Sequence, residues 1–197
     1  MDLLSYQRTI FGFHGCDKHV ADAVLTGETK LSASENAYDW LGRGIYFWEH
    51  GPLRALEWAQ QQALRKGSRI KTPAVLGAVI QLGNCFDLLD VRYTRELARS
   101  AARMIDTASS LGIRLPRNQA ATKRDYDWLK RHLDCFVLNN AIPEIEDTLQ
   151  TSFDTVRGVF QEGEPAFKGA GLRMKSHIQI AVRNPIAIIG YFKPENL

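Results

Sequence analysis

Residues 40–49 read Trp-Leu-Gly-Arg-Gly-Ile-Tyr-Phe-Trp-Glu, so two glycines flank Arg43 just before a run of aromatic residues. Ile45-Tyr46-Phe47 predicts a short strand, because β-branched and aromatic residues favour extended chain. Glycine lets a backbone approach a ligand closely, and aromatic faces stack on flat heterocycles. Taken alone, however, this stretch favours the simpler interpretation of a tight turn into a core strand.

A second feature lies upstream, where residues 9–13 (Thr-Ile-Phe-Gly-Phe) predict a strand that ends at His14-Gly15. Asp17 is placed to cap the helix that follows, since its carboxylate can accept from backbone N–H groups of the first turn. By itself, His14-Gly15 is more typical of an edge histidine before a turn glycine than of a ligand site. Residues 31–44, rich in Ser, Asn, Asp and Gly, predict a loop.

The remaining chain alternates short apolar runs with helical spacing. Further strands are expected at 74–82, 85–89, 176–183 and 186–192, the last two as a hairpin or a crossover pair. Further helices are expected from Pro52 to near Gly67, at 92–109 and at 123–139. Residues 153–160 are ambiguous and 161–171 predict a loop. The pattern predicts a single α+β domain over 1–197, with a mostly helical insertion at about 91–160.

Composition limits the functional classes. The chain has 197 residues, 45% of them hydrophobic, and a net charge of only +3, which is ordinary for a globular domain. No apolar run is long enough to cross a bilayer, and the N-terminus lacks the pattern of a signal peptide. Three widely spaced cysteines form neither a disulfide framework nor a metal motif, so we expect a cytoplasmic protein without a metal.

Together, His-Gly after the first strand, the GxGIYF run and the helix with a Trp-Ala pair resemble the NAD-binding core of ADP-ribosyltransferases. The likeness is strongest to the poly-ADP-ribose polymerase branch, whose signature is His, Tyr and Glu on three strands. It covers the N-terminal third and the last two strands, whereas residues 91–160 match no pattern of that family. The resemblance implies a split antiparallel β-sheet core and NAD as substrate.

The resemblance also implies roles for individual residues. His14 would bind a ribose hydroxyl of NAD, and the backbone of Gly15 would hold the nicotinamide carboxamide. Tyr46 would stack on the nicotinamide ring, with Trp58 closing its other face, although the spacing to Trp58 is about one residue off. A charge-assisted contact from an arginine would reach the pyrophosphate. The implied NAD-binding residues are His14, Gly15, Arg43, Gly44, Tyr46 and Trp58.

The third signature position departs from the family. On the expected strand 176–182, Gln179 occupies the slot of the glutamate, next to His177 on the same face. Glutamine keeps a hydrogen bond but lacks the charge that steadies an oxocarbenium-like transition state. The implied catalytic set is therefore Gln179, His14 and Tyr46. Glu162 or Glu164, in the loop before this strand, is an alternative source of the carboxylate.

The middle of the chain shows an uneven charge distribution, basic before residue 135 and acidic after it. Arg92, Arg95, Arg99 and Arg103 recur at helical spacing and form one stripe, here called the α-insertion stripe. Two interpretations stay open for it: a solvated face paired with the acidic segment 144–154, or a phosphate-binding surface for RNA. Tyr93, Tyr126 and Trp128 lie close in sequence and are candidates for base stacking.

These observations favour an NAD-dependent mono-ADP-ribosyltransferase of the bacterial toxin or antiphage effector type. RNA or another nucleic acid is the favoured acceptor, with protein next, and an antitoxin or chaperone-type partner is compatible with such an effector. One alternative is a catalytically silent module that binds NAD or ADP-ribose. The other is a plain nucleic-acid-binding domain, and no membrane association is expected in any of the three.

Overall fold

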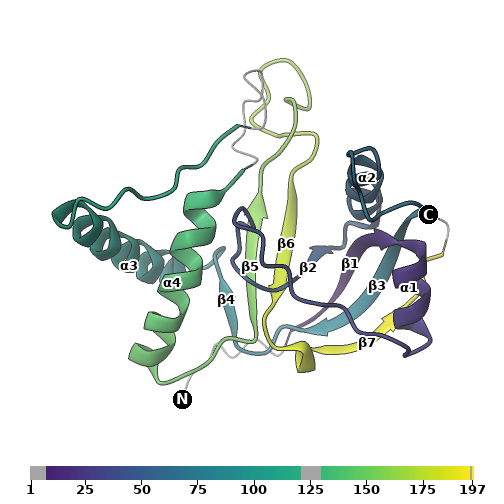
Figure 1. Cartoon of the computed structure of the whole chain (residues 1–197), viewed down its shortest axis with the longest axis horizontal. Helices are drawn as coiled ribbons and strands as arrows, with labels where there is room; N and C mark the ends of the chain where they lie inside the picture. Colours follow the sequence, from purple (N-terminus) through teal and green to yellow (C-terminus); the bar gives the residue numbers. More distant parts are fainter. Residues whose placement is uncertain (1–7, 121–129, 196) are drawn as a thin grey trace.

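The computed structural model describes residues 8–120, 130–195 and 197 as a mixed α/β fold around one seven-stranded sheet (Figure 1). Its strand order is β4-β5-β6-β2-β1-β3-β7, and every neighbouring pair is antiparallel except β4–β5. The strands are β1 (Thr9–Asp17), β2 (Ile45–Glu49), β3 (Pro73–Gln81), β4 (Cys85–Asp87), β5 (Thr155–Phe160), β6 (His177–Val182) and β7 (Ile188–Phe192). The helices are α1 (Lys18–Leu25), α2 (Pro52–Ala63), α3 (Val91–Ser110) and α4 (His132–Leu149), with a 3-10 turn at Pro185–Ala187.

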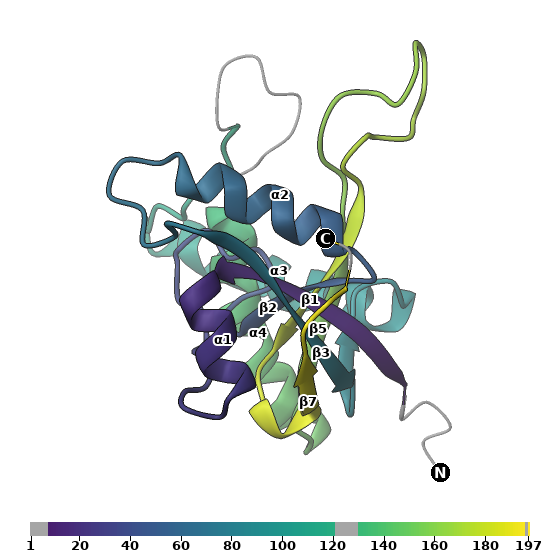
Figure 2. The same cartoon turned by 90° about the vertical axis from the view of Figure 1, so that its right-hand side faces the viewer.

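The helices gather at the two ends of the sheet (Figures 1 and 2). Helices α3 and α4 pack at the β4–β5 end over a core that includes Phe86, Val156 and Ile142. Helix α2 lies across β1 and β3 at the other end, and α1 packs beside β3. The stretch of sheet between α2 and α4, built by β2 and β6, is the part that carries the cavity described below.

Strand β1 is long because it pairs with β3 along its whole length, from Thr9 opposite Gln81 to Asp17 opposite Pro73. On its other side it pairs with β2 only at Gly12 and Phe13, opposite Glu49 and Trp48. From His14 onward β1 is therefore no longer paired with β2. The sheet is continuous in strand order but open between the second half of β1 and the first half of β2.

Most predicted strands and helices are confirmed as to type, whereas the ends of several of them differ from the prediction. The first strand runs on to Asp17, whose carboxylate caps α1 by accepting from the backbone N–H of His19 at 2.9 Å. The ambiguous segment 153–160 forms β5, inside the sheet between β4 and β6, so the helical insertion ends before Thr155 rather than at 160. The last two strands are not a hairpin: β6 pairs with β2 and β5, whereas β7 pairs with β3 at the far side.

The second helix of the insertion begins later in the chain than the sequence pattern predicts. Of the expected range 123–139, residues 123–129 lie outside the described part, and the helix itself begins at His132 and ends at Leu149. Pro143 lies inside it, although proline usually ends a helix. The helix continues because Leu138, Ile142 and Ile145 are buried against the core, which outweighs the lost backbone bond.

None of the described helices is both long and apolar enough to span a membrane. Cys16, Cys85 and Cys135 are all buried free thiols. Within residues 8–120 and 130–195, no group of histidine, cysteine and acidic side chains is arranged to hold a metal ion.

Candidate active site

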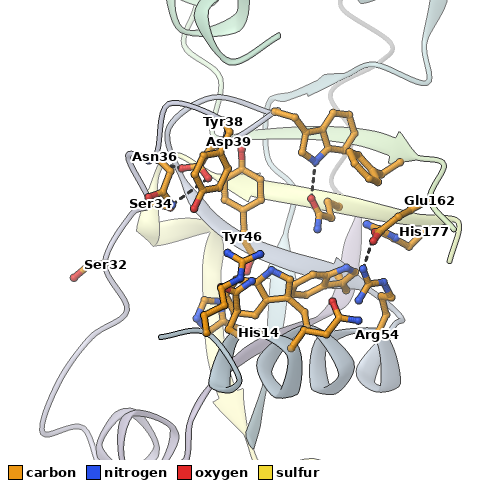
Figure 3. Close-up of a pocket in the computed structure, with 18 residues that line it drawn as sticks. His14, Ser32, Ser34, Asn36, Tyr38, Asp39, Tyr46, Arg54, Glu162 and His177 are labelled. Atoms are coloured by element: carbon orange, nitrogen blue, oxygen red, sulfur yellow. Dashed lines mark hydrogen bonds and ion pairs between the residues drawn. The ribbon is translucent and has the colours of Figure 1, made fainter. Parts of the chain in front are cut away.

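A cavity of about 310 Å³ opens on the sheet face between α2 and the loop at 32–40 (Figure 3). Its floor is β2 and β6, which present Tyr46 and Trp48 beside His177 and Gln179, because alternate residues of a strand share a face. Helix α2 supplies one wall and the loop at 32–40 supplies the other. The volume is at the lower end of the range typical of small-molecule sites.

His14 closes the opening between β1 and β2. Its Nδ1 lies 2.8 Å from the backbone oxygen of Tyr46, and because a carbonyl only accepts, Nδ1 carries the proton and donates. Burial lowers the pKa of the His14 ring, so the ring is neutral at pH 7. The remaining nitrogen, Nε2, is then a pure acceptor, suited to a ligand hydroxyl. The hydrogen bond from the His14 side chain thus links β1 to β2 at a point where their backbones are not paired.

Tyr46 is held at both ends of its ring. Its hydroxyl accepts from the backbone N–H of Leu41 at 2.9 Å and donates to the backbone oxygen of Gly42 at 2.8 Å. Burial raises the pKa of this hydroxyl well above its ordinary value, so it stays protonated. The ring lines the cavity and also contacts the core under α4. Replacement by alanine would consequently cost stability as well as any ligand contact.

Gly15 and Trp58 meet where α2 crosses β1. A Cβ atom on Gly15 would lie 2.3 Å from the backbone oxygen of Ala55 and 3.2 Å from the Trp58 ring. Close helix packing is thus sufficient reason for a glycine at this position, whatever its backbone binds. Trp58 itself lines the cavity and packs on Trp48, with ring centroids 5.7 Å apart.

Arg43 and Gly44 are not part of the cavity lining. The Arg43 guanidinium is exposed and pairs with Glu35 at 2.8 Å. Gly44 lies against β6, where an added Cβ would come within 3.0 Å of Ala181. The structure therefore brings His14, Tyr46, Trp58 and Gln179 to one cavity, whereas Gly15, Arg43 and Gly44 lie outside its lining. Their NAD contacts remain predictions without a geometric basis.

Gln179 is oriented by a tryptophan from the far wall. Its Oε1 accepts from Trp40 Nε1 at 2.6 Å, which leaves its amide NH₂ group as the donor available to a ligand. The neighbouring residue on β5 is Gly158, where a Cβ would lie only 2.8 Å from the Trp40 ring. The missing side chain makes room for Trp40 to reach across to Gln179.

Of the two alternative carboxylates, only Glu162 lines the cavity. It accepts from Arg54 Nη2 at 2.6 Å, and this ion pair links the end of β5 to the first turn of α2. Glu164 is exposed and lies outside the cavity lining.

Trp40, Trp48 and Arg54 are among the cavity residues that the sequence did not predict, and the role of His177 was left open. His177 Nδ1 donates to the backbone oxygen of Lys175 at 2.6 Å, and its ring stacks on Phe160. Burial lowers the pKa of this ring, so Nε2 is an unprotonated acceptor. Alternation on β2 was a usable signal for Trp48, since it shares a face with Tyr46, but nothing in the sequence pointed to Arg54.

Three of these side chains hold four buried polar atoms that have no hydrogen-bond partner among the described residues: Trp48 Nε1, Arg54 Nε and Nη1, and His177 Nε2. Arg54 Nη1 still lies 3.7 Å from the carboxylate of Glu57. Buried polar atoms are almost always paired, because leaving one unpaired costs free energy. These four atoms around one cavity are suited to hydrogen-bond a polar ligand.

The α-insertion stripe lies away from this cavity, on α3 (Figure 1). Arg103 pairs with Glu144 of α4, Arg99 pairs with Glu96 at 2.6 Å, and Arg92 lies over the ring of Tyr93. These pairs favour the solvated-face interpretation, including its predicted contact with the acidic segment. Tyr126 and Trp128 lie outside the described residues.

No known family profile matches the sequence, and no solved structure does. The chain is 24% identical, over 204 aligned positions, to an uncharacterized protein of Methanocaldococcus jannaschii. The alignment covers 94% of this chain and 87% of the archaeal one. The similarity thus extends over nearly the whole domain, insertion included.

Proposed function

We propose that the protein is an NAD-dependent mono-ADP-ribosyltransferase with its active site in the cavity over β2 and β6. The observation that carries the proposal is the opening of the sheet at His14, which places a neutral histidine acceptor beside an aromatic cavity. This is the arrangement expected of the split-sheet fold that the sequence resembles. The buried unpaired atoms of Trp48, Arg54 and His177 support a polar ligand there.

In this proposal the nicotinamide ring lies among Tyr46, Trp48 and Trp58, where aromatic faces favour a flat heterocycle. His14 Nε2 accepts from a ribose hydroxyl and fixes the sugar. The bond between the nicotinamide nitrogen and the ribose anomeric carbon breaks, and nicotinamide leaves as a neutral molecule with the bonding electron pair. The cationic sugar then bonds to a nucleophile of the acceptor.

The acceptor loses its proton as that bond forms, and His177 is the base in this scheme. The ring lines the cavity, and its unprotonated Nε2 has no hydrogen-bond partner within the described part of the chain. The Gln179 amide donates a hydrogen bond to the sugar but supplies no charge. Glu162 is therefore the residue that supplies negative charge to the cationic sugar in this scheme. Loss of the signature glutamate favours transfer of a single ADP-ribose over chain elongation.

A second candidate is a silent module that binds NAD or ADP-ribose. It is favoured by Gln179 and by the Arg54 ion pair, which neutralises Glu162. Both candidates suit a cytoplasmic effector of the toxin or antiphage type that acts on nucleic acid or protein.

The test is incubation of the protein with NAD labelled in its adenylate half, together with a cell lysate that is afterwards separated into RNA, DNA and protein. The transferase predicts label in one macromolecular fraction and release of free nicotinamide. Saturable NAD binding without nicotinamide release, with every acceptor fraction, would establish the silent module instead.

A further inference from the structure

The connection from α2 to β3 forms a concentrated basic surface. Residues 64–72 read Leu-Arg-Lys-Gly-Ser-Arg-Ile-Lys-Thr and contain four cations and no acidic residue. We call this segment the basic loop. The side chains of Arg65, Lys66, Arg69 and Lys71 are exposed, and no ion pair joins them to a carboxylate in the part of the chain that the structure describes. They differ in this from Arg99 and Arg103 of α3, which have carboxylate partners.

The basic loop adjoins the active-site cavity. A second hollow, of about 320 Å³, is lined by residues 65–70 together with Trp58 and Gln62. Trp58, Gln62 and Arg65 also line the first cavity, so the two meet at the Trp58 ring. A chain lying along the basic loop would therefore reach the cavity mouth, where an acceptor group has to stand.

The loop is tied to the strand that carries His14. The Asp17 carboxylate at the end of β1 accepts from the backbone N–H groups of Lys71 at 2.7 Å and Thr72 at 2.9 Å. Within the loop, Ser68 Oγ accepts from the backbone N–H of Ile70 at 3.0 Å. These bonds fix the path of the loop relative to the opening of the sheet.

We propose that the basic loop forms the binding track for a single-stranded nucleic acid, the acceptor of the transferase described above. Several unpaired cations in a row match a repeating phosphate backbone better than a single anionic group. A duplex cannot enter a cavity of about 310 Å³, so the nucleotide that reaches it has to be unpaired. Only the role of the nucleic acid as acceptor rests on the proposed function, because binding along the basic loop does not require turnover.

The experiment measures binding of a fluorescein-labelled single-stranded RNA of about 16 nucleotides over a series of salt concentrations. The test variant carries Arg65→Gln, Lys66→Gln, Arg69→Gln and Lys71→Gln. The matched control carries Arg95→Gln, Arg99→Gln, Arg114→Gln and Arg117→Gln, which removes the same charge from exposed positions elsewhere. Nicotinamide release from NAD without acceptor is measured on all three proteins.

The track predicts that the loop variant binds RNA at least about tenfold more weakly and that its plot of log affinity against log salt is flatter by about 2 to 3 units. The control variant should bind like the parent. Equal weakening in both variants, or no RNA binding by the parent, would overturn the proposal. So would unchanged RNA binding with a raised KM for NAD, which would assign the loop to the NAD phosphates. If no protein releases nicotinamide but only the loop variant loses RNA, the track stands and the transferase fails.

Discussion

Two buried polar clusters lie on opposite faces of the same strand, and they differ in whether their atoms are paired. On one face of β2, Glu49 joins Arg157 of β5 and Asp87 of β4 in a network in which the guanidinium donates to both carboxylates, at 2.6 to 3.3 Å. We call this the closed cluster. On the other face, Trp48 lies with Arg54 and His177 around the cavity, and each of these three has a buried polar atom without a hydrogen-bond partner among residues 8–120 and 130–195. We call this the open cluster.

The difference separates a structural role from a binding role. A buried ion network is stable only when its charges and hydrogen-bond donors are satisfied, and the closed cluster meets that condition inside the protein. The open cluster leaves its donors and its acceptor to be satisfied from outside. Damage to the closed cluster should therefore appear as lost stability, and damage at the cavity as lost turnover.

The largest effect is expected from Arg157→Met. Removal of the guanidinium leaves the buried Asp87 carboxylate without its charge partner and leaves Glu49 with only Arg8, at 3.6 Å, and breaking a buried pair in this way costs about 3–5 kcal/mol. The free energy of unfolding, measured by urea titration, should fall by that amount. The matched change Arg54→Met removes the ion pairs with Glu162 and with the half-exposed Glu57, both of which solvent can reach better than Asp87, and should cost less than half as much. Equal losses would remove the distinction between the clusters.

At the cavity, Gln179 is expected to give opposite signs for two substitutions. Gln179→Ala removes a donor to the sugar and leaves Trp40 Nε1 unpaired, so NAD turnover should fall roughly tenfold to a hundredfold, the equivalent of about 1–3 kcal/mol. Gln179→Glu keeps an acceptor for Trp40 and adds negative charge, so turnover should hold or rise.

Glu162→Gln is the companion to that pair and is assayed in the same way. Loss of turnover here, with both Gln179 variants like the parent, would transfer the catalytic carboxylate role to Glu162. Release of nicotinamide by Gln179→Glu alone, with none from the parent, would favour the silent module.

The pH dependence should be shifted toward acid. Burial lowers the pKa of His14 and of His177, so each ring is half protonated at a lower pH than the 6.5 of a free histidine. Turnover should consequently fall to half at a pH below 6.5. The free energy of unfolding should also fall as the pH drops, because these histidines take up protons at a higher pH in the unfolded chain than in the folded protein. A loss of turnover centred at or above 6.5, in kcat/KM measured against pH, would contradict neutral histidines.

The smallest effect is expected on α3. Arg95→Gln together with Arg99→Gln alters an exposed helix face, where ion pairs contribute at most about 1 kcal/mol. Unfolding and nicotinamide release should both match the parent, as should the salt dependence of RNA binding. A flatter salt dependence in this variant would return the α-insertion stripe to the phosphate-binding interpretation.

Sequence reasoning reached the parts of the site that depend on local pattern. Alternation along the chain put His177 and Gln179 on one face. The glycines around Arg43 were expected to approach a ligand, but Gly42 and Gly44 pack against α4 and β6 instead. What it could not reach depends on contacts between distant elements. A glycine is needed at position 15 because α2 crosses β1 there. Arg54 is held at the site by its ion pair with Glu162, just after β5. The late end of α4 is likewise set by tertiary burial, which overrides Pro143.

The most direct test of the account is nicotinamide release from NAD by the parent and by His14→Ala, with the stability of both measured by urea titration. We expect measurable release by the parent, roughly a tenfold to hundredfold lower rate for the variant, and a far smaller change in unfolding free energy than Arg157→Met produces. Equal rates for the two proteins would contradict the placement of NAD at the opening between β1 and β2.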